Sequence, residues 1–147
     1  KFPDFKLSDD NGKIFQLYKD SNSSFLVLYF YPKDETPGCT KQACYFKYYY
    51  ADFKQLDCEI IGISSDDEKS HKNFKTNYNL PFKLLCDKHS QLRKEIKLPK
   101  DFFGLSPGRI TFLLNSNNEI LYIYKSSLKM KSHIIEVLEF LNKNILV

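Results

Sequence analysis

The sequence has no apolar run close to the roughly 18 residues that a membrane-spanning helix needs, so neither a membrane span nor a membrane partner is expected. It has no internal repeat and no low-complexity segment. No two of its four cysteines form a Cys-x-x-Cys pair, which argues against a disulfide reductase that works through such a pair. Arginine is scarce, with only Arg93 and Arg109 among 22 basic residues. A globular domain remains, and its chemistry must come from a few side chains.

The composition bounds the size and class of this domain. With 147 residues the chain is long enough to bury a core, and residues 1–147 are expected to form a single domain. Hydrophobic residues make up 42% and aromatic residues 16%, which excludes a disordered chain. The sequence begins at Lys1 rather than Met, which suggests a processed or trimmed form. A targeting segment that had been removed would leave no trace in it.

The formal net charge is only +4. The densest basic cluster consists of Lys125, Lys129 and Lys131, at the start of the last predicted helix. Nucleic-acid binding calls for denser clustering or a recognisable motif, so we interpret the cluster as solvated surface. Nucleic acid stays open as the less favoured partner.

The four cysteines are compatible with a disulfide scaffold, a zinc site or redox chemistry. A chain of this length does not need disulfides to fold. The spacings of Cys39, Cys44, Cys58 and Cys86 do not give the paired knuckles typical of zinc sites. Redox use in a reducing intracellular compartment fits best. Cys58 and Cys86 lie beside apolar strand residues, so both are expected to be buried.

Residues 29–44 carry the most information. The apolar run 25–31 predicts a buried strand, and Pro32 ends it. Cys39 follows a Pro-Gly break where a helix should begin, because residues 40–56 contain no breaker and have apolar side chains at helical spacing. A thiol there faces unpaired backbone N–H groups and the positive end of the helix dipole, which favour the thiolate. The pattern predicts a reactive Cys39; the alternative is an inert buried cysteine.

The rest of the chain alternates between strands and helices. The turn Asp10-Asn11-Gly12-Lys13 predicts an N-terminal β-hairpin. Further strands are expected at 58–64, 84–86, 110–114 and 120–124. Helices are expected from the capping residues 65–68 to about Asn77 and at 90–96. A final amphipathic helix is expected to place Ile134, Val137, Leu138 and Leu141 on one face. Residues 98–108 read as a loop. This order predicts an α/β fold with a central mixed sheet flanked by helices.

Polar residues after the second buried strand allow two interpretations. Ser65 and Glu68 match a capping box at the start of the next helix. Asp66 and Asp67 could suggest a metal site, but carboxylates are usual at helix starts. His71 is expected on a solvated helix face.

Pro32, Thr36 and Cys39 fit the signature Pro-x-x-x-Thr-x-x-Cys, and the chain resembles the peroxiredoxins. The longer string Phe-Tyr-Pro-Lys-Asp-x-Thr-Pro-Gly-Cys-Thr-x-Gln-Ala-Cys is similar to the peroxiredoxin Q branch, also called bacterioferritin comigratory proteins. The likeness continues through three further segments, 61–64, 80–82 and 107–112. The resemblance covers nearly the whole chain and implies a thioredoxin-like fold with an N-terminal hairpin.

The resemblance also implies site residues. Cys39 would be the peroxidatic thiol, and the Thr36 hydroxyl would donate to its thiolate or accept from the peroxide. Pro32 would shape the loop and shield the thiolate from water. Arg109 would stabilise the thiolate and the leaving oxygen, and Gln42 would lie near the substrate. Without the resemblance these residues read as a strand terminator, a loop hydroxyl and surface polar groups.

Cys44 is the resolving thiol that the resemblance implies. Five helical residues advance about 7.5 Å along the axis, and a disulfide rarely tolerates Cα atoms more than about 7 Å apart. The first turns of the helix would therefore have to unwind after Cys39 is oxidised. The alternative for Cys44 is a small apolar residue on a buried helix face, which would leave Cys58 or Cys86 to resolve.

The resemblance implies a thiol peroxidase that reduces hydrogen peroxide and organic hydroperoxides, recycled by a thioredoxin-like or glutaredoxin-like dithiol protein. It implies no metal, haem or flavin, and a monomer rather than an obligate oligomer. A peroxide sensor that passes its oxidation to a partner protein remains an alternative, because it begins with the same reaction. An inactive binding module is disfavoured by the intact motif residues. The sequence does not choose among cytoplasm, nucleus and plastid.

Overall fold

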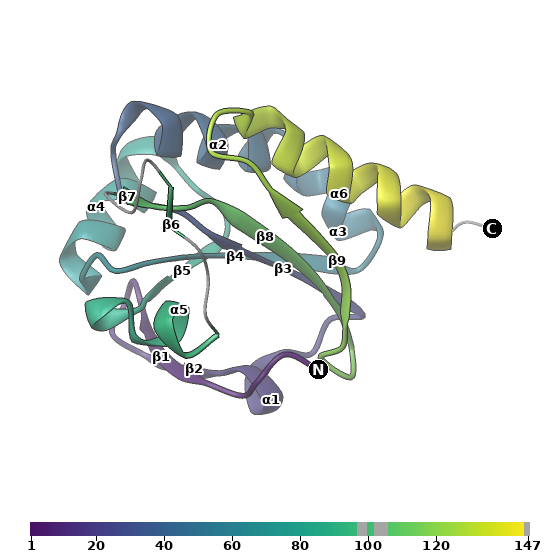
Figure 1. The fold of residues 1–147 in the computed structure, drawn as a ribbon, viewed down its shortest axis with the longest axis horizontal. Coiled ribbons are helices and arrows are strands. Elements are labelled where there is room, and N and C mark those ends of the chain that lie inside the picture. Colours follow the sequence, from purple (N-terminus) through teal and green to yellow (C-terminus); the bar gives the residue numbers. More distant parts are fainter. Residues whose placement is uncertain (97–99, 102–105, 146–147) are drawn as a thin grey trace.

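The structure is a computed structural model that describes residues 1–96, 100–101 and 106–145. A seven-stranded sheet crosses the molecule in the order β2-β1-β5-β4-β3-β8-β9 (Figure 1). Its strands are β1 (Lys6–Asp9), β2 (Ile14–Gln16), β3 (Phe25–Phe30), β4 (Cys58–Ser64), β5 (Lys83–Cys86), β8 (Ile110–Asn115) and β9 (Ile120–Lys125). A separate pair is formed by β6 (Lys100–Asp101) and β7 (Ser106–Pro107).

The predicted helices are present, but the predicted helix 40–56 is divided at Tyr49, and the short helix Leu17–Asp20 was not predicted. The helices are α1 (Leu17–Asp20), α2 (Pro37–Tyr48), α3 (Tyr50–Gln55), α4 (Glu68–Tyr78), the 3₁₀ turn η1 (Lys88–Ser90), α5 (Gln91–Glu95) and α6 (Met130–Ile145). None of the described helices combines the length and apolar character needed to cross a bilayer.

The central strand β3 places the site. It pairs in parallel with β4 and antiparallel with β8, and helices and loops cover both of its faces. Its side chains are therefore almost all buried, which explains the unbroken apolar run. The chain leaves the carboxyl end of β3 and enters the loop before α2, so the rigid middle of the sheet fixes the base of that loop.

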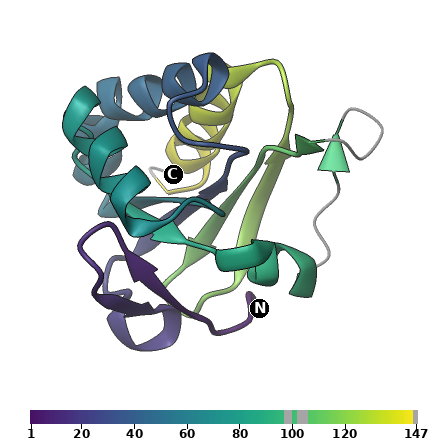
Figure 2. The same ribbon diagram turned by 90° about the vertical axis from the view of Figure 1, so that its left-hand side faces the viewer.

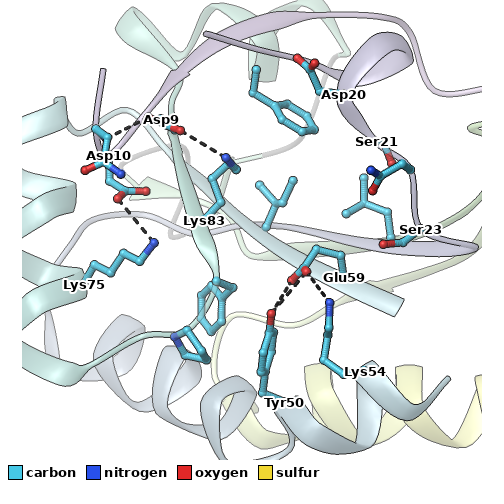
Figure 3. A pocket seen from close by; sticks show the side chains of 17 residues that line it. Asp9, Asp10, Asp20, Ser21, Ser23, Tyr50, Lys54, Glu59, Lys75 and Lys83 are labelled. Atoms are coloured by element: carbon cyan, nitrogen blue, oxygen red, sulfur yellow. Dashed lines mark hydrogen bonds and ion pairs between the residues drawn. The ribbon is translucent and has the colours of Figure 1, made fainter. Parts of the chain in front are cut away.

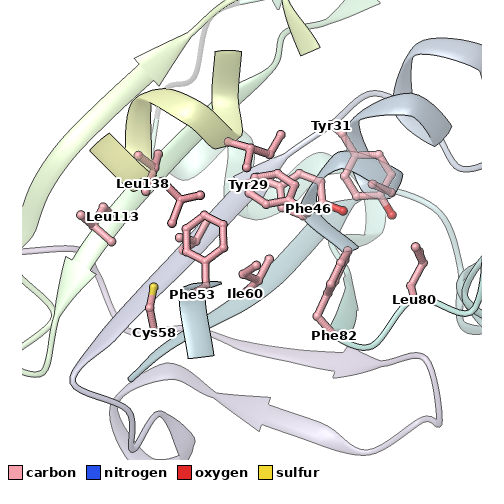
Figure 4. Packing of buried hydrophobic residues seen from close by; sticks show 14 of the residues in the cluster. Tyr29, Tyr31, Phe46, Phe53, Cys58, Ile60, Leu80, Phe82, Leu113 and Leu138 are labelled. Carbon is pink, nitrogen blue, oxygen red and sulfur yellow. The ribbon is translucent and has the colours of Figure 1, made fainter. Parts of the chain in front are cut away.

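Two apolar clusters hold the layers together. On one face, α2, α3, α4 and α6 pack on the sheet through a cluster that includes Tyr29, Phe46, Phe53, Phe74 and Leu138 (Figure 4). On the other face of the sheet lie the N-terminal segment and α5 (Figure 2). They pack on it through Phe2, Phe5, Phe15 and Leu92. The face predicted for the last helix is confirmed, since its four apolar residues are all buried.

The predicted N-terminal hairpin is confirmed. β1 pairs antiparallel with β2, and Gly12 in the turn has φ +80°, which glycine adopts without strain. The Asp9 carboxylate accepts hydrogen bonds from the backbone N–H groups of Asn11 and Lys13 at 2.8 and 2.9 Å. This side chain closes the turn, and it explains why the aspartate is 4% exposed.

The helix that carries Cys39 differs from the prediction in two ways. It begins at Pro37 rather than after Cys39, because proline is favoured at the first helical position. It also ends at Tyr48, where Tyr49 (φ −96°, ψ 8°) separates α2 from α3. Cys39 therefore lies inside the first turn of a 12-residue helix.

Two predictions around α4 were wrong. The helix is capped by Asp67, whose carboxylate accepts from the Ser70 N–H at 2.9 Å, and not by a box at Ser65. His71 is completely buried rather than solvated. Most of the loop predicted at 98–108 lies outside the described residues.

Candidate active site

Cys39 projects from the first turn of α2 into the interface of that helix with the sheet. Its exposed fraction is 1%, and its thiol is free. Backbone N–H groups in a first turn have no partners within the helix, so they and the helix dipole favour negative charge there. The predicted position of Cys39 at a helix start is therefore confirmed, and its reactivity stays a prediction.

Arg109 supplies a cation at the sulfur. It lies at the start of β8, the strand next to β3, and is 8% exposed. Its Nη1 donates to Cys39 Sγ at 3.0 Å and to Gln42 Oε1 at 2.9 Å. An Nη nitrogen has two hydrogens, so both are used. The structure thus joins three predicted residues from two elements that lie far apart in the sequence.

Gln42 is completely buried one helical turn after Cys39. Arginine can only donate, so the Gln42 atom that faces Arg109 must be the amide oxygen. The Nε2 group then points elsewhere and has no hydrogen-bond partner among the described residues. A buried donor without a partner beside the thiol marks a place where an oxygen-containing ligand would bind.

The backbone around Arg109 fixes its side chain. Nε donates to the Ser127 carbonyl at 3.3 Å, and Gly38 faces the guanidinium. A Cβ on Gly38 would lie 2.7 Å from Arg109 Nη2 and 2.6 Å from Met130 Cε. Glycine is needed here because the guanidinium approaches the helix backbone so closely.

His133 is a supporting residue that the sequence analysis did not identify. Its Nε2 donates to the Ser126 carbonyl at 2.7 Å, next to the residue that holds Arg109, and its Nδ1 lies 2.8 Å from Thr111 Oγ1. Burial lowers the pKa of His133 to about 4, an effect that the Arg109 charge adds to and the Ser126 hydrogen bond opposes. The ring is therefore neutral, and Thr111 donates to it.

Thr36 and Pro32 are in the loop between β3 and α2. The Thr36 hydroxyl donates to the Lys33 carbonyl at 2.8 Å, and its own carbonyl accepts from the Thr40 N–H at 2.8 Å. The hydroxyl oxygen keeps a lone pair with which it can still accept. Pro32 is half-buried and is the second residue after the end of β3. The roles that the resemblance implies for both residues remain predictions.

Cys44 lies on the same helix as Cys39 and is partly buried, with a free thiol. Both cysteines are thus within one continuous helix, as the spacing argument assumed. Cys58 and Cys86 are 1% and 2% exposed, so their predicted burial is confirmed. Burial raises the pKa of the Cys58 thiol, which makes it a poor nucleophile.

Asp34, Asp66 and His71 could be read as a metal site, since one ligand atom from each lies within 4.8 Å of the others. Their geometry is that of a hydrogen-bond network instead. His71 Nδ1 is 2.6 Å from Asp34 Oδ2, which is too short for a metal between them. Asp66 Oδ2 accepts from Ser64 Oγ at 2.7 Å and from the Asp34 N–H at 2.8 Å.

A hollow of about 370 Å³ lies at the other end of the parallel strands, between the hairpin and α3 (Figure 3). Its three lysines are paired with carboxylates: Lys54 with Glu59 (3.0 Å), Lys75 with Asp10 (3.5 Å) and Lys83 with Asp9 (3.2 Å). These charges satisfy one another, so the hollow offers no reactive group comparable with Cys39.

Known proteins share both the sequence and the fold. The AhpC/TSA family matches residues 1–123. The chain is 49% identical to the chloroplastic peroxiredoxin Q of Arabidopsis thaliana over 139 residues, covering 95% of this chain and 64% of that protein. It is 45% identical to the chloroplastic peroxiredoxin Q of Sedum lineare, covering 95% of this chain and 74% of that protein. The chain thus spans less than two thirds of the length of some of these plant relatives.

A solved structure of a related protein has the same fold. The bacterioferritin comigratory protein of Xanthomonas campestris is 30% identical and superposes with a TM-score of 0.84, covering 95% of this chain and 90% of that one. The predicted thioredoxin-like fold with an N-terminal hairpin is therefore confirmed. Together with the Cys39–Arg109 pair, these matches show that the chain belongs to the AhpC/TSA family and, within it, to the peroxiredoxin Q branch.

Proposed function

We propose that this chain is a thiol peroxidase that reduces hydrogen peroxide and alkyl hydroperoxides. One observation carries the proposal: the Arg109 guanidinium lies 3.0 Å from Cys39 Sγ in a buried site at a helix start. A fixed cation there stabilises the thiolate and then the negative charge that develops on the leaving oxygen. The X. campestris relative is described as having alkyl peroxide reduction activity, which supports the second substrate class.

In the first step the Cys39 thiolate attacks one peroxide oxygen. An S–O bond forms, the O–O bond breaks, and its electron pair leaves with the distal oxygen, which takes a proton and departs as water or alcohol. Cys39 becomes a sulfenic acid. The unpartnered Nε2 of Gln42 is available to donate to a peroxide oxygen, while its Oε1 keeps Arg109 in place.

In the second step the Cys44 thiolate attacks the sulfenic sulfur. The S–S bond forms as the S–O bond breaks, and the departing hydroxide takes a proton to become water. Cys39 and Cys44 are five residues apart in α2, which places them about 7.5 Å apart along the axis of an intact helix. The first turns of α2 therefore unwind before this bond closes. A dithiol protein of the thioredoxin or glutaredoxin type then reduces the disulfide by exchange.

The plant relatives are named as chloroplastic proteins. On that basis we favour a plastid, among the reducing compartments considered, as the place where this chain works.

Peroxide consumption coupled to a thioredoxin system tests the function on wild type, Cys39→Ser, Cys44→Ser and the matched control Cys58→Ser. We expect no turnover without Cys39, turnover that depends on a monothiol without Cys44, and normal turnover for the control. Full turnover without Cys44 would overturn the proposed resolving step. A wild type that reacts once and then stalls would favour the sensor that the sequence left open.

A further inference from the structure

A buried hydrogen-bond network connects the loop before α2 to helix α4. Asp34, in that loop, has a side chain that is 2% exposed. Its carboxylate accepts from Tyr31 Oη at 2.5 Å and from Ser70 Oγ at 2.8 Å, and it pairs with His71 Nδ1 at 2.6 Å. Its backbone N–H donates to Asp66 at 2.8 Å. We call these five residues the Asp34 clamp.

Asp34 and His71 form a buried ion pair at the centre of the clamp. His71 Nδ1 faces the Asp34 carboxylate and Nε2 faces the Leu85 carbonyl at 2.9 Å, so both ring nitrogens must donate, which only the imidazolium does. Burial alone would lower the pKa of His71, but the hydrogen bond to Asp34 and the charge of that carboxylate raise it to about 10. This pair is therefore charged at neutral pH, while the Asp66 carboxylate accepts from Ser64 Oγ and the Asp34 N–H.

The clamp lies directly upstream of the reacting groups. Tyr31 precedes Pro32, and Asp34 is two residues before Thr36 and five before Cys39. A second link comes from Asn77 of α4, which donates to the Glu35 carboxylate at 2.5 Å. The loop is thus attached to α4 on its upstream side, whereas α2 begins at Pro37, just beyond these links.

Glu35 lies between the residues attached to α4 and the start of α2. Its φ of +59° is in the left-handed region, where residues other than glycine are uncommon. At the other end of α2, Tyr49 leaves helical geometry before α3 begins. Two backbone irregularities therefore flank the 12-residue helix that holds both thiols.

We propose that His71 and Asp34 are positioning residues that keep the loop 31–35 in place while α2 unwinds, so that unwinding begins after Glu35 and stops at Tyr49. This inference rests on the proposed function, because it concerns the step in which Cys39 meets Cys44. The clamp keeps Pro32 at a fixed position next to the start of α2, so the loop is already in place when the helix reforms after the disulfide is reduced.

Hydrogen exchange of the reduced and oxidised protein tests where unwinding stops. We expect oxidation to expose the hydrogen-bonded amides of α2, from Thr40 onwards, and to leave those of Tyr31, Asp34 and α4 protected. The disulfide can be formed with diamide, so this measurement does not depend on peroxidase activity. Loss of protection at Tyr31 and Asp34 in the oxidised wild type would overturn the proposal, whether or not the protein consumes peroxide.

The rate at which Cys39 reacts with peroxide tests whether the clamp positions the reacting groups in the reduced protein. Asp34→Asn with His71→Gln removes both charges together, because a single substitution would leave one buried charge unpaired. We expect the second-order rate constant for Cys39 to fall about tenfold or more, since misplacement of reacting groups by less than 1 Å has effects of that size. Ser70→Ala is a milder variant that leaves both charges in place and should lower the rate by about fivefold or less.

The matched control is Phe53→Leu, in the core of α3. Phe53 is fully buried and its ring lies 6.2 Å from that of Phe46, so the substitution lowers stability without touching the clamp. Equal rates for this control and the double variant, at equal stability, would overturn the positioning role. A wild type that fails to react while Tyr31 and Asp34 stay protected would instead reject the proposed function and leave the clamp standing.

Discussion

Gly38→Ala is a small change that should move the Arg109 guanidinium, the cation beside Cys39. The new Cβ would lie 2.7 Å from Arg109 Nη2, whereas ordinary van der Waals contact begins near 3.4 Å. The guanidinium or the helix must therefore shift by about 0.7 Å, against a hydrogen bond of 3.0 Å from Nη1 to Cys39 Sγ. A misplacement of about 1 Å can lower a rate by roughly 100-fold. We expect a 10- to 100-fold fall, or about 1.4–2.7 kcal/mol in the activation free energy.

The assay is the initial rate of peroxide consumption at limiting peroxide, which reports the second-order step at Cys39. The chain has no tryptophan, so loss of peroxide is followed directly rather than by a tryptophan signal. Unfolding by urea is measured in parallel. The other clashing atom is the terminal carbon of Met130, which can rotate away, so we expect only a small loss of stability.

Two further glycine-to-alanine variants separate this effect from general damage. At Gly12, where φ is +80° and no atom lies within 4 Å of the new Cβ, we expect a stability loss of about 1 kcal/mol. At Gly62, the Cβ would lie 2.8 Å from the Tyr29 ring and 2.9 Å from Leu84, so overpacking should cost about 1–3 kcal/mol. Neither should slow peroxide consumption. If folded Gly38→Ala retained the wild-type rate, the placement of Arg109 would not matter and the reasoning would fail.

Three more predictions concern buried groups. The pKa of His133, about 4, lies below the ordinary 6.5, so the contribution of this residue to stability is present above pH 6.5 and is lost as the pH falls towards 4. Urea unfolding measured from pH 7 to pH 4 should show a weaker pH dependence of stability for His133→Gln than for wild type. An unchanged pH dependence would contradict the lowered pKa of His133. Burial raises the pKa of Cys58, so iodoacetamide should label this thiol only in unfolded protein, and labelling of the native protein at the rate of a free thiol would argue against it. Phe46→Ala should lower the free energy of unfolding by about 3–5 kcal/mol, because the ring is fully buried and stacks on Tyr29; a loss below 1 kcal/mol in urea would show that the cluster repacks.

Local patterns were sufficient to predict most of the fold. The run 25–31, the Asn-Gly turn and the apolar face of α6 each follow from short-range rules of burial and backbone geometry. The prediction that Arg109 lies beside Cys39 came from the family resemblance rather than from sequence spacing, since 70 residues separate the two. The structure adds the reason for it, which is that β8 pairs with β3 and so places Arg109, the residue just before β8, beside the start of α2.

The features that were missed depend on partners far along the chain. His71 lies in a polar stretch that reads as a solvated helix face, but Asp34, 37 residues earlier, gives it a buried partner. His133 is held by Thr111, 22 residues earlier. The break at Tyr49 has no glycine or proline to announce it. Such positions become visible only when the packing of the helices on the sheet is known.

The exposed side of α2 has a consequence for how such a protein can change during evolution. On its exposed side, Lys41 and Tyr48 are solvent-facing, and no contact joins them to Cys39 or Arg109 among the described residues. Substitutions there alter helix propensity by up to about 0.7 kcal/mol each without altering the chemistry. In the proposed mechanism, selection would thereby adjust how long the Cys39 sulfenic acid persists, and with it the balance between rapid recycling and irreversible oxidation, through residues that do not touch the peroxide.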